Sequence, residues 1–148
     1  MADDDVLRQL HATGAALGRP PEPVPEADPW EPDDPLDPRS AVVVVFPGPP
    51  GIRVRLHDDG EDAVQLDTYV TFDVPRRHTV AVLRALLSGE GAYTRVPGGV
   101  VGAISRRLGL ELVEELVVDV PGATYAQAVP WAPASPLNGW LAGLPRRP

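Results

Sequence analysis

Runs of hydrophobic and alternating residues predict three β-strands in the first half of the chain. Ser40–Phe46 contains an unbroken β-branched run, which is typical of a strand covered on both faces. Ile52–His57 and Ala63–Val74 alternate between apolar and polar residues, the pattern of half-buried strands. Proline, glycine and acidic residues separate the strands at 47–51 and 58–62. The pattern predicts an antiparallel meander.

Tight turns would also fix how these strands pair. They place Val44 opposite Val54, and His57 opposite Ala63. One face of the sheet is then almost wholly apolar and should form the core. The other face mixes apolar and polar side chains, and we expect it to carry the N-terminal helix, the segment after it, or a partner. Its residues are Val43, Val45, Arg53, Arg55, His57, Asp67 and Tyr69.

Three segments have the spacing of amphipathic helices. Asp3–Leu17 places its apolar residues on one face and ends at a glycine followed by two prolines. Arg76–Ser88 carries a clear apolar stripe and stops at Gly89. A further helix is expected at about Val100–Leu108. The last two should cover the apolar face of the sheet.

The remaining segments complete an α+β fold. Ala92–Val96 and Leu110–Val120 are expected to be strands, the second extending the meander, and Ala123–Ala134 to be mostly loop. Ser135 before Pro136 is typical of a helix start. The predicted fold is an antiparallel meander of three to five strands with two helices on one face, preceded by a proline- and acid-rich N-terminal arm.

The tract Pro20–Pro38 divides the chain. Eight of its nineteen residues are proline and seven are acidic, so extended polyproline backbone is expected. We expect a short amphipathic helix at 1–18, an arm at 19–39 and one domain at 40–148. Residues 1–40 hold ten acids and three arginines, or −7 of the net −8. The rest of the chain is nearly neutral.

The residue inventory excludes several chemistries. Without cysteine there is no disulfide or thiolate site, and without lysine there is no P-loop or Schiff base. The three histidines do not follow a metal-binding spacing, and no metal or cofactor is expected. Gly98-Gly99 precedes a predicted helix but does not match a phosphate-binding motif. This inventory favours a non-catalytic protein.

Neither a leader nor a membrane span is expected from the sequence. The acidic start at Asp3 to Asp5 lacks the basic residues of a signal peptide. No apolar run approaches the ~20 residues that a membrane-spanning helix needs. We therefore expect a cytoplasmic protein.

Charge suggests where a partner would bind. Residues 76–107 contain six arginines and one acid, whereas the arm is acidic and carries Trp30 as an aromatic anchor. The arm is expected either to dock on this basic surface and compete with an acidic partner, or to stay solvated. Nucleic acid is disfavoured, because the net charge of −8 opposes it and Tyr93 has no neighbouring aromatics. The candidate binding residues are Trp30, Arg53, Arg55, His57, Asp67, Tyr69, Arg76, Arg77, Arg106 and Arg107.

Two classes of function follow. The first is a protein-interaction module, such as an adaptor, an inhibitor or immunity-type protein, or a regulatory protein, that uses the acidic arm and an exposed sheet face. The alternative is a small enzyme or ligand-binding domain in which the polar residues of the mixed face converge on one pocket. A homodimer joined through the valine-rich strand is a third possibility, because exposed strand edges pair readily.

Overall fold

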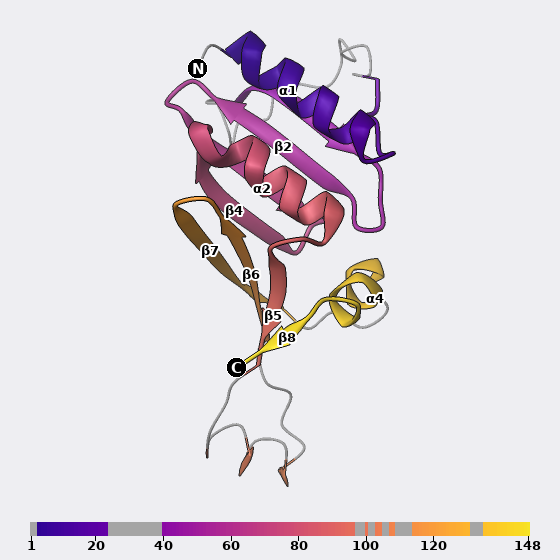
Figure 1. The fold of residues 1–148 in the computed structure, drawn as a ribbon, viewed down its shortest axis with the longest axis vertical. Helices are drawn as coiled ribbons and strands as arrows, with labels where there is room; N and C mark the ends of the chain where they lie inside the picture. Colours follow the sequence, from indigo (N-terminus) through magenta and orange to yellow (C-terminus); the bar gives the residue numbers. More distant parts are fainter. Residues whose placement is uncertain are drawn as a thin grey trace, which may run out of the picture.

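The chain folds into helices and two β-sheets. The computed structural model describes residues 3–23, 40–96, 100, 103–104, 107–108, 114–130 and 135–148. Each sheet has four strands, and helices pack against both (Figure 1). This arrangement confirms the predicted α+β class. Trp30, Arg106 and the tract at 24–39 lie outside the described residues.

The first sheet is a meander of four antiparallel strands. It consists of β1 (Ser40–Phe46), β2 (Ile52–His57), β3 (Glu61–Leu66) and β4 (Val70–Pro75), in chain order. The predicted pairing of the first two strands is confirmed, because Val44 lies opposite Val54.

The single long strand predicted over Ala63–Val74 is wrong. Residues 67–69 form a turn, and Leu66 pairs with Val70 across it. Asp67 adopts a positive φ of 46° there, a conformation that Asp tolerates better than most residues. A turn of three residues returns the chain with the same alternation, so the hydrophobic pattern does not reveal it.

The predicted register of the second hairpin is also wrong, by two residues. Ala63 lies opposite Arg55 rather than His57. The turn places Gly60 at a φ of 81°, which a glycine adopts without strain. Because strand side chains alternate with a period of two, this shift leaves each side chain on its predicted face.

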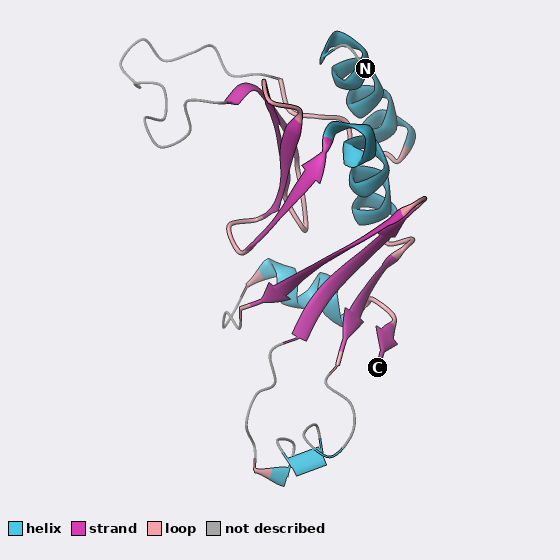
Figure 2. Ribbon diagram, turned by 90° about the vertical axis from the view of Figure 1, so that its left-hand side faces the viewer, coloured by secondary structure: helices cyan, strands magenta, loops and turns pink. Residues whose placement is uncertain are grey.

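Two helices cover the apolar face of the first sheet. They are α1 (Asp3–Ala16) and α2 (Arg76–Ser88), and both predicted helices are confirmed (Figure 2). Val6 and Leu10 of α1 are fully buried in the same hydrophobic cluster as the strand residues. The N-terminal helix is therefore part of the core and lies on the apolar face of the sheet, not on its mixed face.

The second sheet has the strand order β7-β6-β5-β8. Its strands are β5 (Ala92–Arg95), β6 (Glu114–Val120), β7 (Ala123–Val129) and the short β8 (Arg146–Arg147). The strands predicted near 92–96 and 110–120 are confirmed over β5 and β6, but they pair with each other instead of extending the meander.

β7 corrects the loop expected over Ala123–Ala134. It is an edge strand whose side chains are mostly exposed, so it lacks the alternation that predicts a strand. Backbone pairing to β6 after the turn at Gly122 holds it in place. β7 contacts β4 of the first sheet (Figure 1).

The two sheets share one hydrophobic core. Helix α2 contacts β3 and β4 of the first sheet and β6 of the second. The last helix, α4 (Pro136–Ala142), begins as predicted, since Ser135 Oγ accepts a hydrogen bond from Leu137 N at 3.2 Å. Leu137 and Leu141 of α4 are buried in the common cluster. Over the described ranges, none of the helices has the length and apolar character needed to cross a bilayer.

Candidate functional site

The mixed face of the first sheet is partly open. Arg53 is exposed, and no hydrogen bond or ion pair joins its side chain to another described residue. Val43 is 38% exposed on this face, and Tyr69, which lies in the turn between β3 and β4 and not on the face as predicted, is 39% exposed. Arg55 is half-buried. This face therefore exposes a cation and one large apolar side chain, and the β3–β4 turn exposes a second.

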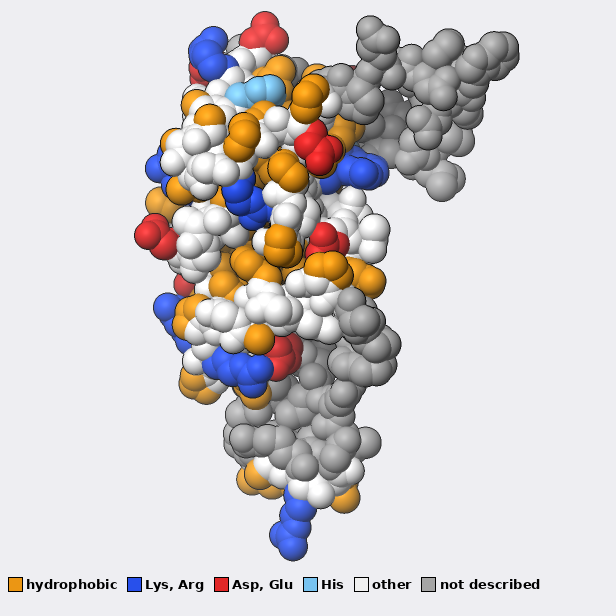
Figure 3. Space-filling view, turned by 90° about the vertical axis from the view of Figure 1, so that its right-hand side faces the viewer, with side chains coloured by type: hydrophobic (Ala, Val, Ile, Leu, Met, Phe, Trp, Pro, Cys, Tyr) orange, Lys and Arg blue, Asp and Glu red, His pale blue; other side chains and the backbone are white. Residues whose placement is uncertain are grey.

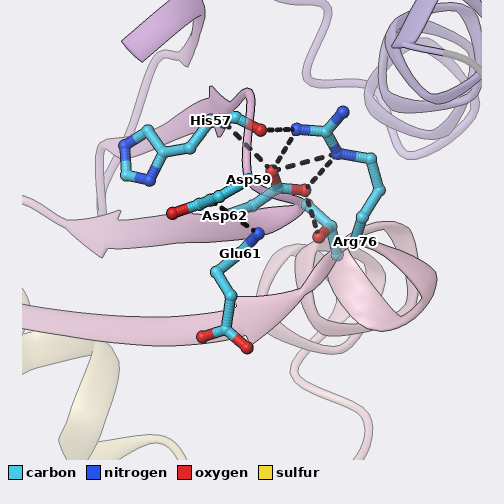
Figure 4. A network of polar contacts seen from close by, with 6 residues as sticks. His57, Asp59, Glu61, Asp62 and Arg76 are labelled. Atoms are coloured by element: carbon cyan, nitrogen blue, oxygen red, sulfur yellow. Dashed lines mark hydrogen bonds and ion pairs between the residues drawn. The ribbon is translucent and has the colours of Figure 1, made fainter. Parts of the chain in front are cut away.

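His57 and Arg76 belong instead to a buried polar network (Figure 4). At its centre is the fully buried carboxylate of Asp62 on β3. Arg76 Nη2 donates to Asp62 Oδ1 at 2.8 Å and also to the His57 carbonyl. Thr79 Oγ1 donates to Asp62 Oδ2 at 2.7 Å, and His57 N to Asp62 Oδ1 at 3.3 Å.

This network fastens the start of α2 to the β2–β3 hairpin. Its charges are paired and hydrogen-bonded. A protein tolerates buried charges only under these conditions. Arg76 N also donates to the carbonyl of Gly60 at 2.8 Å. The network accounts for the position of Arg76. This side chain binds Asp62 within the protein, unlike the exposed arginines with which it was listed as a candidate binding residue.

Asp67 is held at the opposite end of the sheet. Its Oδ1 accepts from Gly51 N at 2.9 Å, and its own N donates to the Gly51 carbonyl at 2.7 Å. Arg19 Nε donates to the Pro47 carbonyl at 2.9 Å in the same region. Burial lowers the pKa of the Arg19 guanidinium, and the charge of Asp67 partly offsets this effect. These contacts tie the segment after α1 to two turns of the first sheet.

The polar residues of the mixed face do not converge on one pocket. Ile52 pairs with Leu66, next to Asp67, whereas His57 is at the other end of β2. Five residues of extended strand separate these ends by about 17 Å. Asp67 and His57 therefore cannot act together on one small substrate.

The most exposed large apolar side chains of the described residues lie between β5 and β6. Val100, Ile104 and Leu108 are 74%, 52% and 67% exposed. Their spacing of four residues matches one face of a helix, and Leu108 N donates to the Ile104 carbonyl at 3.0 Å. The exposed Arg107 adjoins them. We call these four residues the foot patch, because the described parts of the segment 100–108 lie at the lower end of the molecule (Figure 1), where Figure 3 shows a few apolar and basic side chains.

The position of the foot patch shows that one sequence-based prediction was wrong. The sequence analysis also did not identify the patch as a candidate site. A helix near Val100–Leu108 was expected to cover the apolar face of the first sheet, a position that α1 and α2 occupy. The sequence carried the signal, since three apolar residues recur at intervals of four beside two arginines. Periodicity alone does not distinguish an apolar stripe that packs inward from one that faces outward.

A groove runs along α2 on another part of the surface. It has a volume of about 450 Å³ and lies between α1, α2 and the β6–β7 turn. Arg77 and Arg84 line it from α2, and neither side chain has an ion pair or hydrogen bond to another described residue. Its apolar lining consists of Val80, Ala81, Ala85, Val120 and Pro121. Of the predicted candidates that the structure describes, only Arg77 lines this groove.

α2 is also linked to β7 by a polar contact. His78 Nδ1 and Tyr125 Oη are 2.6 Å apart, and their rings meet edge to face. Burial raises the pKa of the Tyr125 phenol.

Among the residues described, no three histidine or acidic side chains gather where they could hold a metal ion. Comparison with protein-family models, curated proteins and solved structures gives no match, so function is inferred from geometry.

Proposed function

We propose that this chain is a non-catalytic protein-interaction module, of the adaptor, inhibitor or regulatory kind. The observation that carries this proposal is the foot patch, where three large apolar side chains are more than half exposed. Exposed apolar groups that are grouped together are typical of protein-binding surfaces. The second proposed contact combines Arg53 and Val43 of the mixed face with Tyr69 of the β3–β4 turn.

The chemistry of the foot patch defines the partner it fits. Side chains repeating every four residues suit an apolar groove that accepts one helix face. The neighbouring Arg107 would lie at the rim of such a groove, where a carboxylate of the partner could pair with it. We therefore propose a partner protein with an apolar groove bordered by acidic residues.

Affinity purification from cells that express the protein tests this proposal with three full-length baits. One is the natural chain. The second is a foot variant with Val100→Ser, Ile104→Ser and Leu108→Ser, and the third is a sheet-face variant with Val43→Thr and Tyr69→Ser. Full-length baits are required, because removing residues 1–40 would take Val6 and Leu10 out of the core.

We expect the foot variant to lose a partner that the natural chain retains in stoichiometric amount. The sheet-face variant should retain less of it. Circular dichroism should show that both variants remain folded, since the substituted side chains are exposed. Recovery of the same proteins by all three baits would contradict the proposal. Loss of self-association alone would identify a second copy as the partner.

A further inference from the structure

The groove along α2 has the features of a site for an acidic peptide. Arg77 and Arg84 are seven residues apart, which is two helical turns, so both side chains lie on the same face of α2. At a rise of 1.5 Å per residue, their positions are about 10 Å apart. The apolar side chains of Val80 and Ala81 lie between them in the sequence and line the groove. The groove thus has two cations separated by an apolar floor.

Two carboxylates also line the groove. Asp119 is already engaged, since Thr124 Oγ1 donates to its Oδ1 at 2.7 Å and Arg147 Nη1 lies 3.7 Å from its Oδ2. Glu90 is exposed and lies beyond Ser88, at the C-terminal end of α2. The cations of Arg77 and Arg84 therefore remain available, whereas Glu90 would repel an acidic ligand at one end.

The chain itself contains a peptide of matching design. Residues 28–32 read Asp-Pro-Trp-Glu-Pro, and residues 34–38 read Asp-Pro-Leu-Asp-Pro. Each repeat has two acids three positions apart, with a proline and one large apolar residue between them. In an extended peptide, residues three positions apart are about 9–10 Å apart. This spacing matches that of the two arginines.

We propose that the groove is a peptide-binding site and that its ligand is the 28–38 repeat of this same chain. The two carboxylates of one repeat would pair with Arg77 and Arg84. Its apolar residue, Trp30 or Leu36, would rest on the floor at Val80 and Ala81. This inference goes beyond the proposed function, because it involves neither the foot patch nor the mixed sheet face.

A fluorescent peptide of residues 27–38 tests the proposal by anisotropy against full-length chains at low salt. The reference protein is a neutralised chain, in which the four acids of its own repeats are replaced by their amides. Those substitutions are Asp28→Asn, Glu31→Gln, Asp34→Asn and Asp37→Asn. We expect saturable binding to the neutralised chain and at least fivefold weaker binding to the natural chain, whose own repeat competes.

Substitutions in the groove show whether binding occurs there. In the neutralised chain, Arg77→Ala with Arg84→Ala should weaken binding about tenfold, as expected for two exposed ion pairs. Glu90→Gln should tighten binding, an effect that a purely structural role would not produce. Arg146→Ala is the control, because Arg146 is an exposed arginine on β8 that does not line the groove, and its substitution should leave the affinity unchanged.

Three results would overturn the proposal. The absence of saturable binding to the neutralised chain would exclude an acidic-peptide site. Equal weakening by Arg146→Ala and the groove variant would show nonspecific charge attraction. Equal affinity for the natural and neutralised chains would show that the chain's own repeat does not occupy the groove. None of these results depends on the partner of the foot patch.

Discussion

At the scale of single residues, the buried carboxylate of Asp62 joins α2 to the first sheet. Its two oxygens accept hydrogen bonds from Arg76, Thr79 and the backbone of His57. Asp62→Asn removes the charge and leaves the Arg76 guanidinium without its counter-ion. We expect a loss of about 3 kcal/mol in the free energy of unfolding, measured by urea denaturation.

Replacing both Asp62 and Arg76 distinguishes the effect of an uncompensated charge from the effect of the lost hydrogen-bonded shape. Asp62→Leu with Arg76→Met removes both charges and keeps apolar volume, so it should be less destabilising than Asp62→Asn alone. A double variant as unstable as the single one would show that the hydrogen-bonded shape, and not the uncompensated charge, controls stability at this position.

Tyr125 makes the stability of the folded chain decrease as the pH becomes alkaline. Burial raises the pKa of its phenol in the folded chain above the ordinary value of 10.0. Its contribution to stability is therefore complete below about pH 10 and declines as the pH rises through the folded-state pKa. Tyr125→Phe should flatten this alkaline decline in thermal unfolding curves. An unchanged decline in the variant would assign the effect to other groups.

At the scale of elements, Gly14 marks where α1 meets the first sheet. A Cβ at this position would lie 2.5 Å from Phe46 Cε1 and 2.6 Å from the Arg19 carbonyl oxygen. Gly14→Ala should therefore destabilise the chain by about 1–3 kcal/mol through overpacking, although alanine is the better helix former.

Gly139 in α4 is the matched control. A Cβ there meets nothing within 4 Å, so Gly139→Ala should stabilise the chain by up to about 1 kcal/mol through helix propensity alone. Differential scanning calorimetry of both variants compares the two glycines directly. Stabilisation by Gly14→Ala would contradict the close packing of α1 on β1.

The sequence predicted elements better than their connections, for physical reasons. Periodicity located α1, α2 and β2, because burial of one face dictates the residues at regular intervals, and an unbroken β-branched run located β1. The turn at Asp67 was not predicted, because it preserves the alternation on either side. β7 was not predicted, because an exposed edge strand of Ala, Thr and Gln carries no apolar pattern.

The proposed contact surfaces overlap only in part with the residues predicted from the sequence, for similar reasons. Arg53, Arg77, Tyr69 and Arg107 are exposed, as predicted for residues that contact a partner. Charge alone could not reveal that Arg76 is buried against Asp62, since the two are fourteen residues apart in the chain. Nor could the apolar residues of the foot patch be distinguished from core residues without the fold around them.

At the scale of the whole molecule, the surfaces proposed for binding lie apart. The foot patch projects between β5 and β6 at one end, whereas the groove lies between α1, α2 and the β6–β7 turn. A chain with this layout could hold a partner at its foot independently of a peptide in its groove. The central claim is that the foot patch contacts another protein directly.

Site-specific photo-cross-linking at Ile104 tests that claim most directly. A photoreactive residue replaces Ile104 in the full-length chain, and a control carries it at Gln127, an exposed position on β7. After irradiation in cells that express the protein, the expected result is one discrete covalent adduct from position 104 and none from position 127. No adduct at position 104, or the same adducts from both positions, would contradict the claim.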